Sequence, residues 1–170
     1  MATKLPAYIL KDCNIVAAGE NRVGQAAEIT IPVFEKTLED MRNAGMIKPR
    51  RVSMGLEATG LMFKETAFDP RMLATFASNG PSQNFIAYGY MEDEGDGTEH
   101  AARCEMVVDM TKHDPGGWAT AQKAEVQMDL TVHAYTLFVD DVEVIQVDDF
   151  RLLVGGVEQM PGRASALRIS

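Results

Sequence analysis

Residues 123–134 read Lys123-Ala124-Glu125-Val126-Gln127-Met128-Asp129-Leu130-Thr131-Val132-His133-Ala134, and they change character at every position. Small or apolar side chains occupy the even positions, and polar side chains occupy the odd ones. Because successive side chains of a strand point to opposite faces, the pattern predicts a long strand with one buried and one wet face. A second apolar segment follows over 142–147. The pair Asp140-Asp141 between the two suits a tight turn, so we expect a hairpin.

Other parts of the chain also indicate strands, and these lie at 8–18, 24–31, 51–57, 60–66, 83–90, 103–110 and 150–154. Residues 51–57 and 60–66 are expected to pair with each other as a hairpin. The acidic segment 91–99 reads as a solvated hairpin loop. Trp118 is expected to anchor the turn-rich corner at 112–117.

One helix is predicted to begin after Asp69-Pro70 and to end at Asn79-Gly80-Pro81. Asp is a favoured residue just before a helix, and Pro is favoured at the first helical position. Residues 33–46 are ambiguous, because their apolar residues also fall on one side of a helix. The pattern alone therefore favours a short amphipathic helix there.

Composition limits the class of protein. With 170 residues and 46% apolar content, the chain is long enough for a single domain, 1–170, with a proper core. Many short strands and one helix predict a mainly β fold, an antiparallel β-sandwich or partly closed barrel. The formal net charge of −9 argues against a protein that grips nucleic acid, since such proteins neutralise phosphates. Neither a signal peptide nor a run of roughly 20 apolar residues is found, so no membrane partner is expected.

The motifs of enzymes and cofactor-binding proteins are missing from the sequence. It has no nucleophile elbow and no phosphate-binding glycine loop, so we expect no catalysis and no cofactor. Asp93, Asp96 and Glu99 offer oxygen ligands, but their spacing is not that of a calcium loop, and a hydrophilic turn is favoured. Cys13 and Cys104 are too few for a disulfide framework, and each is expected to be a small buried thiol.

Several short motifs follow one another in a specific order. They are Asn14 with Gly19-Glu20-Asn21 and Gly24, then Glu28-Ile29-Thr30-Ile31-Pro32, the segment 39–46, Gly55-Leu56-Glu57, Asp69-Pro70, Asp114-Pro115-Gly116-Gly117-Trp118, the strand through Tyr135, and the segment 155–159. In this order they resemble the major tail tube proteins of contractile-tailed bacteriophages, a family that also supplies the inner tube of R-type pyocins. The resemblance covers nearly the whole chain.

The resemblance implies a structural protein of the virion tail that is made in the host cytoplasm. It implies a hexameric ring with an inner β-barrel, and rings that stack into a tube. Genomic DNA would pass through the lumen without specific binding. The tail sheath, baseplate and tail-terminator proteins would be further partners. In such a wall the wet face of the long strand would line the lumen or the outer wall, with Glu125, Gln127, Asp129 and Thr131 as candidates.

The resemblance also replaces the helix at 33–46 with an extended arm over 33–50 that contacts neighbouring subunits. Its candidate contact residues are Phe34, Leu38, Met41, Arg42, Asn43 and Met46. Within the tail, 155–170, nothing is carried over to the end that starts at Met160-Pro161-Gly162-Arg163, because Pro161 reads there as a helix breaker. A disulfide between subunits through Cys13 and Cys104 is a further hypothesis, since thiols oxidise outside the cell.

A different class of function is kept as the alternative, a cytosolic β-sandwich module that binds a small or carbohydrate ligand. Such a module needs a groove lined by aromatic side chains. The chain has one Trp and four dispersed Tyr residues, which favours the tube.

Overall fold

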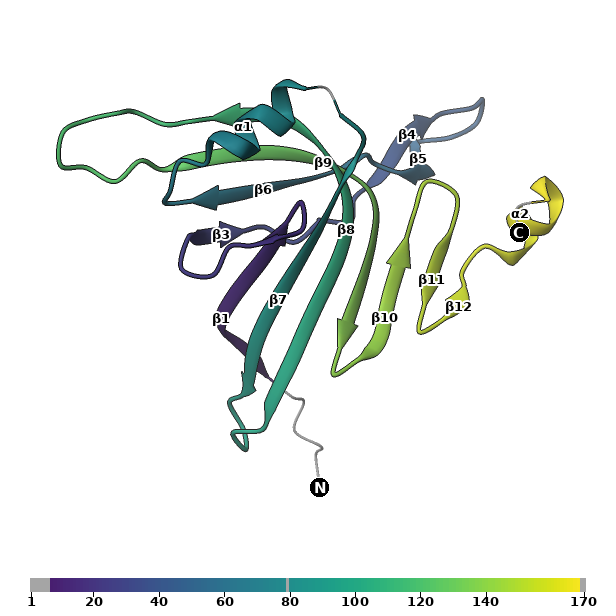
Figure 1. The fold of residues 1–170 in the computed structure, drawn as a ribbon. Helices are drawn as coiled ribbons and strands as arrows, with labels where there is room; N and C mark the ends of the chain where they lie inside the picture. Colours follow the sequence, from purple (N-terminus) through teal and green to yellow (C-terminus); the bar gives the residue numbers. More distant parts are fainter. Residues whose placement is uncertain (1–6, 79, 169–170) are drawn as a thin grey trace.

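The computed structural model describes residues 7–78 and 80–168, and it shows a mainly antiparallel β fold with two short helices (Figure 1). The elements are β1 (Tyr8–Ala17), β2 (Glu20–Asn21), β3 (Ala26–Ile29), β4 (Lys36–Met41), β5 (Arg50–Leu56), β6 (Thr59–Glu65), α1 (Pro70–Ala77), β7 (Gln83–Asp93), β8 (Glu99–Asp114), β9 (Val126–Val139), β10 (Val142–Val147), β11 (Leu152–Val154), β12 (Val157–Glu158) and α2 (Pro161–Leu167). The mainly β prediction is confirmed.

The long strand β9 connects the parts of the main sheet. One of its edges pairs with β8 along nearly the whole strand. Its other edge pairs with β6 over Val126–Val132 and with β10 over Tyr135–Val139. The sheet therefore runs in the order β12-β11-β10-β9-β8-β7-β1-β2, and β6 and β3 branch from it at β9. The predicted hairpin at Asp140-Asp141 is confirmed, and both aspartates have positive φ angles.

A bulge divides β9 into two halves. Val132 pairs with Val108 and Ala134 pairs with Val107, so His133 is the extra residue between them. An extra residue in one strand shifts the alternation of its side chains. The even positions up to Val132 are buried as predicted, but beyond the bulge Tyr135 is buried in place of Ala134.

The core lies between the two parts of the curved sheet. Phe63 on β6 and Phe85 on β7 meet edge to face, with ring centroids 6.3 Å apart, and neither is exposed to solvent. Helix α1 closes one end of the core with Met72, which is buried. Asp69 caps this helix as predicted, by accepting a hydrogen bond from the Arg71 amide at 2.9 Å. The predicted end at Asn79 lies outside the described residues, and the helix itself ends at Ala77.

Two expectations about residues 33–66 are wrong. Residues 36–41 form the strand β4, which pairs with β5 in a separate two-stranded sheet, so the helix predicted from pattern does not form. The expected pairing of 51–57 with 60–66 does not form either, because β6 pairs with β3 and β9. The physical reason is burial, since Leu61 and Phe63 of β6 enter the core while the β4–β5 pair remains largely exposed.

The C-terminal tail also differs from expectation, because residues 161–167 form the helix α2. Pro161 occupies the first helical position, where its missing N–H is not needed, so it starts the helix instead of breaking it. Trp118 packs edge to face on Phe68 at 5.5 Å as an anchor for the corner, although 76% of it stays exposed. The long strand begins at Val126, three residues later than the alternation, which begins at Lys123.

Gly116 provides a test of how the corner before β9 is held. Its φ is +69°, and a Cβ atom there would lie 2.2 Å from the carbonyl oxygen of Glu125. We expect Gly116→Ala to lower the free energy of unfolding by about 2 kcal/mol or more, through left-handed strain and this overlap. Gly117→Ala is the matched control, because a Cβ there meets nothing within 4 Å, and it should stay within about 0.5 kcal/mol. Urea denaturation of both variants measures the difference, and equal losses would contradict the account.

Candidate functional site

The main sheet has one face that turns away from the core, here called the open face. It is defined by two rows of residues that run across β1, β7, β8, β9 and β10 in register. The rows are Asn14, Tyr88, Arg103, Phe138, Glu143 and Val16, Ile86, Glu105, Thr136, Gln146. None of these residues is buried, whereas the residues on the opposite face of the same strands form the core. The open face is therefore a surface available for function.

Charges on the open face are mostly negative and mostly paired. Arg103 donates a hydrogen bond to Glu105 and lies over the Phe138 ring, with 4.3 Å from Cζ to the ring centroid. Farther along β8, Glu99 accepts a hydrogen bond from the Tyr90 hydroxyl at 2.9 Å. That bond is the main cause of a raised pKa for Tyr90. The arrangement presents hydroxyl, amide and carboxylate groups to whatever faces it.

The predicted wall residues occupy one end of this surface. Gln127, Asp129 and Thr131 lie in β9 on the side away from the core, and Gln127 Nε2 donates to Asp129 Oδ1 at 3.2 Å. Glu125 is exposed but precedes the strand. Sequence reasoning did not connect these residues with Arg103 and Glu105, because only the register between strands places them on one face. The alternation over 103–110 was the available signal.

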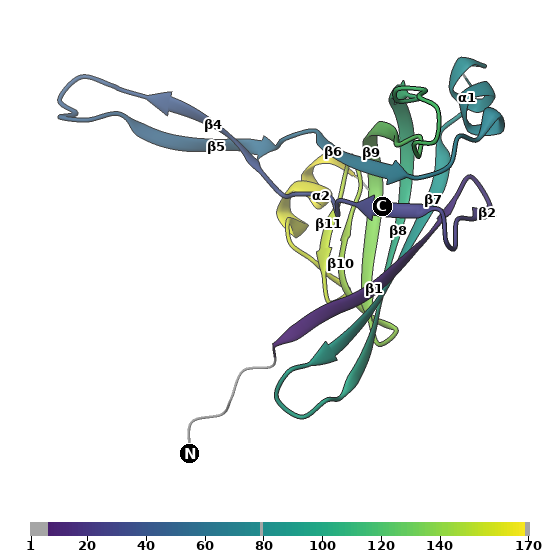
Figure 2. The same ribbon diagram turned by 90° about the vertical axis from the view of Figure 1, so that its left-hand side faces the viewer.

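The second candidate surface overlaps the arm predicted at 33–50. From here on, the name arm is used for β4, β5 and the connecting residues 42–49. Figure 2 shows it projecting from the body of the chain. Leu38 and Met41 are 50% and 44% exposed, and Ile47 at the tip is 97% exposed. Basic residues surround this tip, namely Arg42, Lys48, Arg50 and Arg51.

The other arm residues selected from the sequence have different settings. Phe34 precedes β4 and packs on Tyr135 of the body, with ring centroids 5.2 Å apart, so it holds the base of the arm. Asn43 and Met46 lie in the tip, where the backbone N–H of Asn43 donates a hydrogen bond to the Met46 sulfur at 3.3 Å. Ile47 was not among the contact residues predicted from the sequence, because a single apolar residue in a loop gives no periodic pattern.

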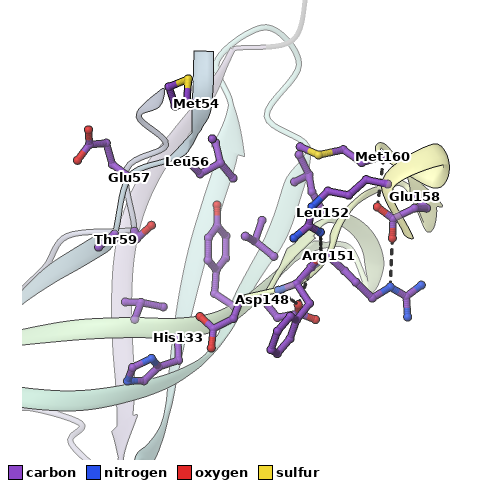
Figure 3. A pocket seen from close by; sticks show the side chains of 18 residues that line it. Met54, Leu56, Glu57, Thr59, His133, Asp148, Arg151, Leu152, Glu158 and Met160 are labelled. Carbon is purple, nitrogen blue, oxygen red and sulfur yellow. Dashed lines mark hydrogen bonds and ion pairs between the residues drawn. The ribbon is translucent and has the colours of Figure 1, made fainter. Parts of the chain in front are cut away.

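A cavity of about 470 Å³ separates the base of the arm from the C-terminal hairpin and α2 (Figure 3). Its apolar lining includes Met54, Leu56 and Leu152. Some of the polar groups nearby have partners, since Asp148 Oδ1 accepts from the Arg151 backbone N–H at 2.7 Å and Arg151 Nε donates to Glu158 at 3.1 Å. The Arg151 hydrogen bond lowers the pKa of Glu158. The cavity is therefore lined by apolar side chains together with a set of polar groups that are bonded to one another.

The main sheet also has free edges at its two ends. At one end, β2 covers only the last two residues of β1, and the Ile15 carbonyl accepts a hydrogen bond from the Arg22 backbone N–H at 2.8 Å. The edge of Tyr8–Asn14 is therefore unpaired on that side within the described chain. At the other end, β12 is only two residues long, and the start of β10 extends past its pairing with β11. Unpaired strand edges are sites where another chain can add a strand. Tyr8, Ile9 and Leu10 on the first edge are all exposed.

The acidic segment after β7 is a turn held by its own carboxylates. Asp93 Oδ1 accepts from the Gly95 amide at 2.6 Å, and Asp96 Oδ1 accepts from the Thr98 amide at 2.9 Å. The Thr98 hydrogen bonds lower the pKa of Asp96. Among the residues that the structure describes, no three His, Cys, Asp or Glu side chains are grouped as a metal ion would require.

Comparison with known proteins identifies the family of the chain. The sequence matches the profile of the family described as phage tail tube protein FII over residues 7–167. The chain belongs to that family. No curated protein matches the sequence. A solved structure is similar in fold, a chain from the sheath/tube terminator of an extracellular contractile injection system in its extended state. Its TM-score is 0.56 at 10% identity, over 81% of this chain and 99% of that chain.

Family membership identifies a phage tail tube protein, a structural component of phage tails and not an enzyme. The candidate site of this tail tube protein is therefore a set of surfaces for assembly. In the parts of the chain that are described, no helix is long and apolar enough to cross a membrane.

The two cysteines of the tail tube protein differ in accessibility. Both are free thiols. Cys104 is 2% exposed, and burial raises its pKa to about 11. Cys13 is partly exposed. The disulfide between subunits stays a prediction, and Cys13 is the thiol that another chain can reach.

Thiol labelling tests this difference. At pH 8 we expect a maleimide to modify Cys13 in the native chain and to modify Cys104 only after unfolding. Thiolate is the reactive form, and a thiol with a pKa of about 11 holds little of it at that pH. Mass spectrometry before and after denaturation measures the labels, with Cys13→Ser as the control that removes the native one. Rapid native labelling of Cys104 would contradict the assignment.

Proposed function

We propose that this tail tube protein forms hexameric rings that stack into a tube, and that genomic DNA passes through the lumen of that tube. The observation that carries the proposal is the surface of the isolated chain. Its accessible area is 11490 Å², whereas a compact monomer of 18.6 kDa exposes about 8,200 Å². The excess is comparable to the area that obligate oligomers bury between subunits.

The free edges support ring closure. The unpaired edge of β1 and the β10–β12 end are different surfaces of one chain. A contact between them is head to tail, and it closes into a ring when the rotation between copies fits. In that ring the main sheets of neighbouring subunits join into one barrel wall. The apolar residues exposed on β1 then become covered.

The open face suits the inner side of that wall. Its residues are mainly uncharged or acidic, and Arg103 is ion-paired. A basic lining would bind the phosphates of passing DNA, whereas this face repels them or leaves them unbound. The proposal therefore puts the open face, with Gln127, Asp129 and Thr131, toward the lumen.

The arm supplies contacts beyond the barrel. Its exposed tip joins an apolar side chain, Ile47, to several basic residues, whereas the chain as a whole carries a net charge of −9. A basic tip is attracted to the acidic surface of another copy. The arm is therefore assigned to contacts between neighbouring subunits or stacked rings. The outer wall would contact the sheath, and the ends of the tube would contact the baseplate and terminator proteins.

Negative-stain microscopy of the purified chain tests the assembly. We expect hollow tubes, or rings with sixfold symmetry, as the concentration is raised. A chain that stays monomeric at all concentrations, measured in parallel by sedimentation, would contradict the proposal and return attention to a monomeric binding module.

The arm tip gives a second test. Because Ile47 is 97% exposed, Ile47→Asp should leave the free energy of unfolding within about 0.5 kcal/mol of wild type. If Ile47 is buried between subunits, the same change should raise the concentration needed for tube formation by about tenfold or more. Ile47→Val, which keeps an apolar side chain, is the matched control and should assemble normally. Sedimentation of assembled tubes measures the effect, and normal assembly of Ile47→Asp would remove the arm tip from the interface.

A further inference from the structure

Arg103 is the cation in the middle of the open face, whereas Lys11 of β1 lies at its rim, 3.7 Å from Glu92. Arg103 is the one Lys or Arg in β7, β9, β10 and the segment Glu99–Asp109 of β8. The next cation along β8, Lys112, lies nine residues farther on and is itself 4.0 Å from Asp114. Register puts Arg103 between Tyr88 and Phe138, in the middle of the sheet. In a ring, every subunit would present this guanidinium at the same height.

The guanidinium of Arg103 is engaged on several sides. Nη1 donates to Glu105, which is two residues along the same strand and so on the same face. Nη2 lies 3.6 Å from Asp141 Oδ1 in the turn between β9 and β10. The plane of the group is near the Phe138 ring, with Cζ 4.3 Å from the ring centroid. About a third of the side chain remains exposed, so the residue is held in place without being buried.

These contacts occupy the groups that would bind a phosphate. Arginine recognises phosphate through two parallel N–H donors, and the same donors recognise a carboxylate. Asp141 is 93% exposed and more distant, so it holds the guanidinium weakly. Glu105 is the carboxylate in direct contact. Removing its charge would leave one cation in each subunit directed at whatever occupies the lumen.

We propose that Glu105 masks Arg103, so that the open face carries a structural arginine without a phosphate-binding site. The inference rests on the proposed function, because it needs the open face to line the lumen. Arg103 serves the wall by its contacts with Phe138 and Asp141, which connect β8 to the next hairpin. Because Glu105 occupies the guanidinium donors of Arg103, Arg103 does not bind the phosphates of DNA that passes through the lumen.

The experiment uses phage particles whose tubes contain one variant chain, with equal tube numbers verified by microscopy. The readout is the rate of DNA release after triggered ejection. Glu105→Gln should slow release by about tenfold or more, because one unmasked cation recurs in every subunit of every ring. Raising the salt concentration during ejection should restore the rate, since salt competes for phosphate contacts.

Two matched variants separate unmasking from simple loss of negative charge. Glu99→Gln removes a carboxylate from the same strand and face but leaves Arg103 paired, so it should release DNA at the wild-type rate. The double variant Arg103→Gln, Glu105→Gln removes the cation together with its mask, and its rate should return to near wild type. Equal rates for Glu105→Gln and Glu99→Gln would overturn the inference.

Thr136→Lys distinguishes failure of the inference from failure of the proposed function. Thr136 is the partner of Glu105 in register, so the new lysine adds an unpaired cation at the same height. If Thr136→Lys slows release while Glu105→Gln does not, the open face lines the lumen and only the masking is wrong. If neither variant slows release, the open face is not in contact with DNA and both ideas are overturned.

Discussion

Hydrogen bonding along both edges of β9 is the constraint on which the rest of the structure depends. A strand of 14 residues pairs with β8 on one edge and is shared between β6 and β10 on the other. Because β6 and β10 cannot occupy the same part of that edge, the sheet has to branch. One branch folds over the core and the other extends toward the C-terminal hairpin. The core, the open face and both free edges are positioned by this division.

The local sequence predicted strands and their buried faces correctly where the alternating apolar residues enter the core. The even positions of 126–132 enter the core, so the alternation there predicted both the strand and its buried face. The arm has no core to enter, and its apolar residues fit a helix and a strand equally well, so the pattern misled over 33–46. Pairing between strands far apart in sequence was also beyond local reasoning. The rows that join Tyr88, Arg103 and Phe138 arise from register, and no single segment contains them.

The surfaces that sequence reasoning described least well are those that the isolated chain leaves uncovered. Ile47, the free edge of β1 and the residues around α2 have little to contact within one copy. Within one copy, the body follows ordinary rules of burial while the arm and the edges do not. If the chain assembles as proposed, other copies cover these surfaces. The contacts that set their residue types are then absent from a single chain, which is why its sequence alone described them least well.

The extra residue at His133 affects which changes in length the chain tolerates. On the C-terminal side of the bulge, Tyr135 faces the core while Thr136 and Phe138 lie on the open face. Deleting His133 would remove the bulge and leave Ala134 opposite Val107 and Tyr135 opposite Met106, so the residues beyond it would keep their faces. A deletion at a regular position, such as Thr136, has no extra residue to absorb it and would exchange the core and open faces of the residues that follow. Related chains can therefore lose a residue at His133 far more easily than elsewhere in the strand.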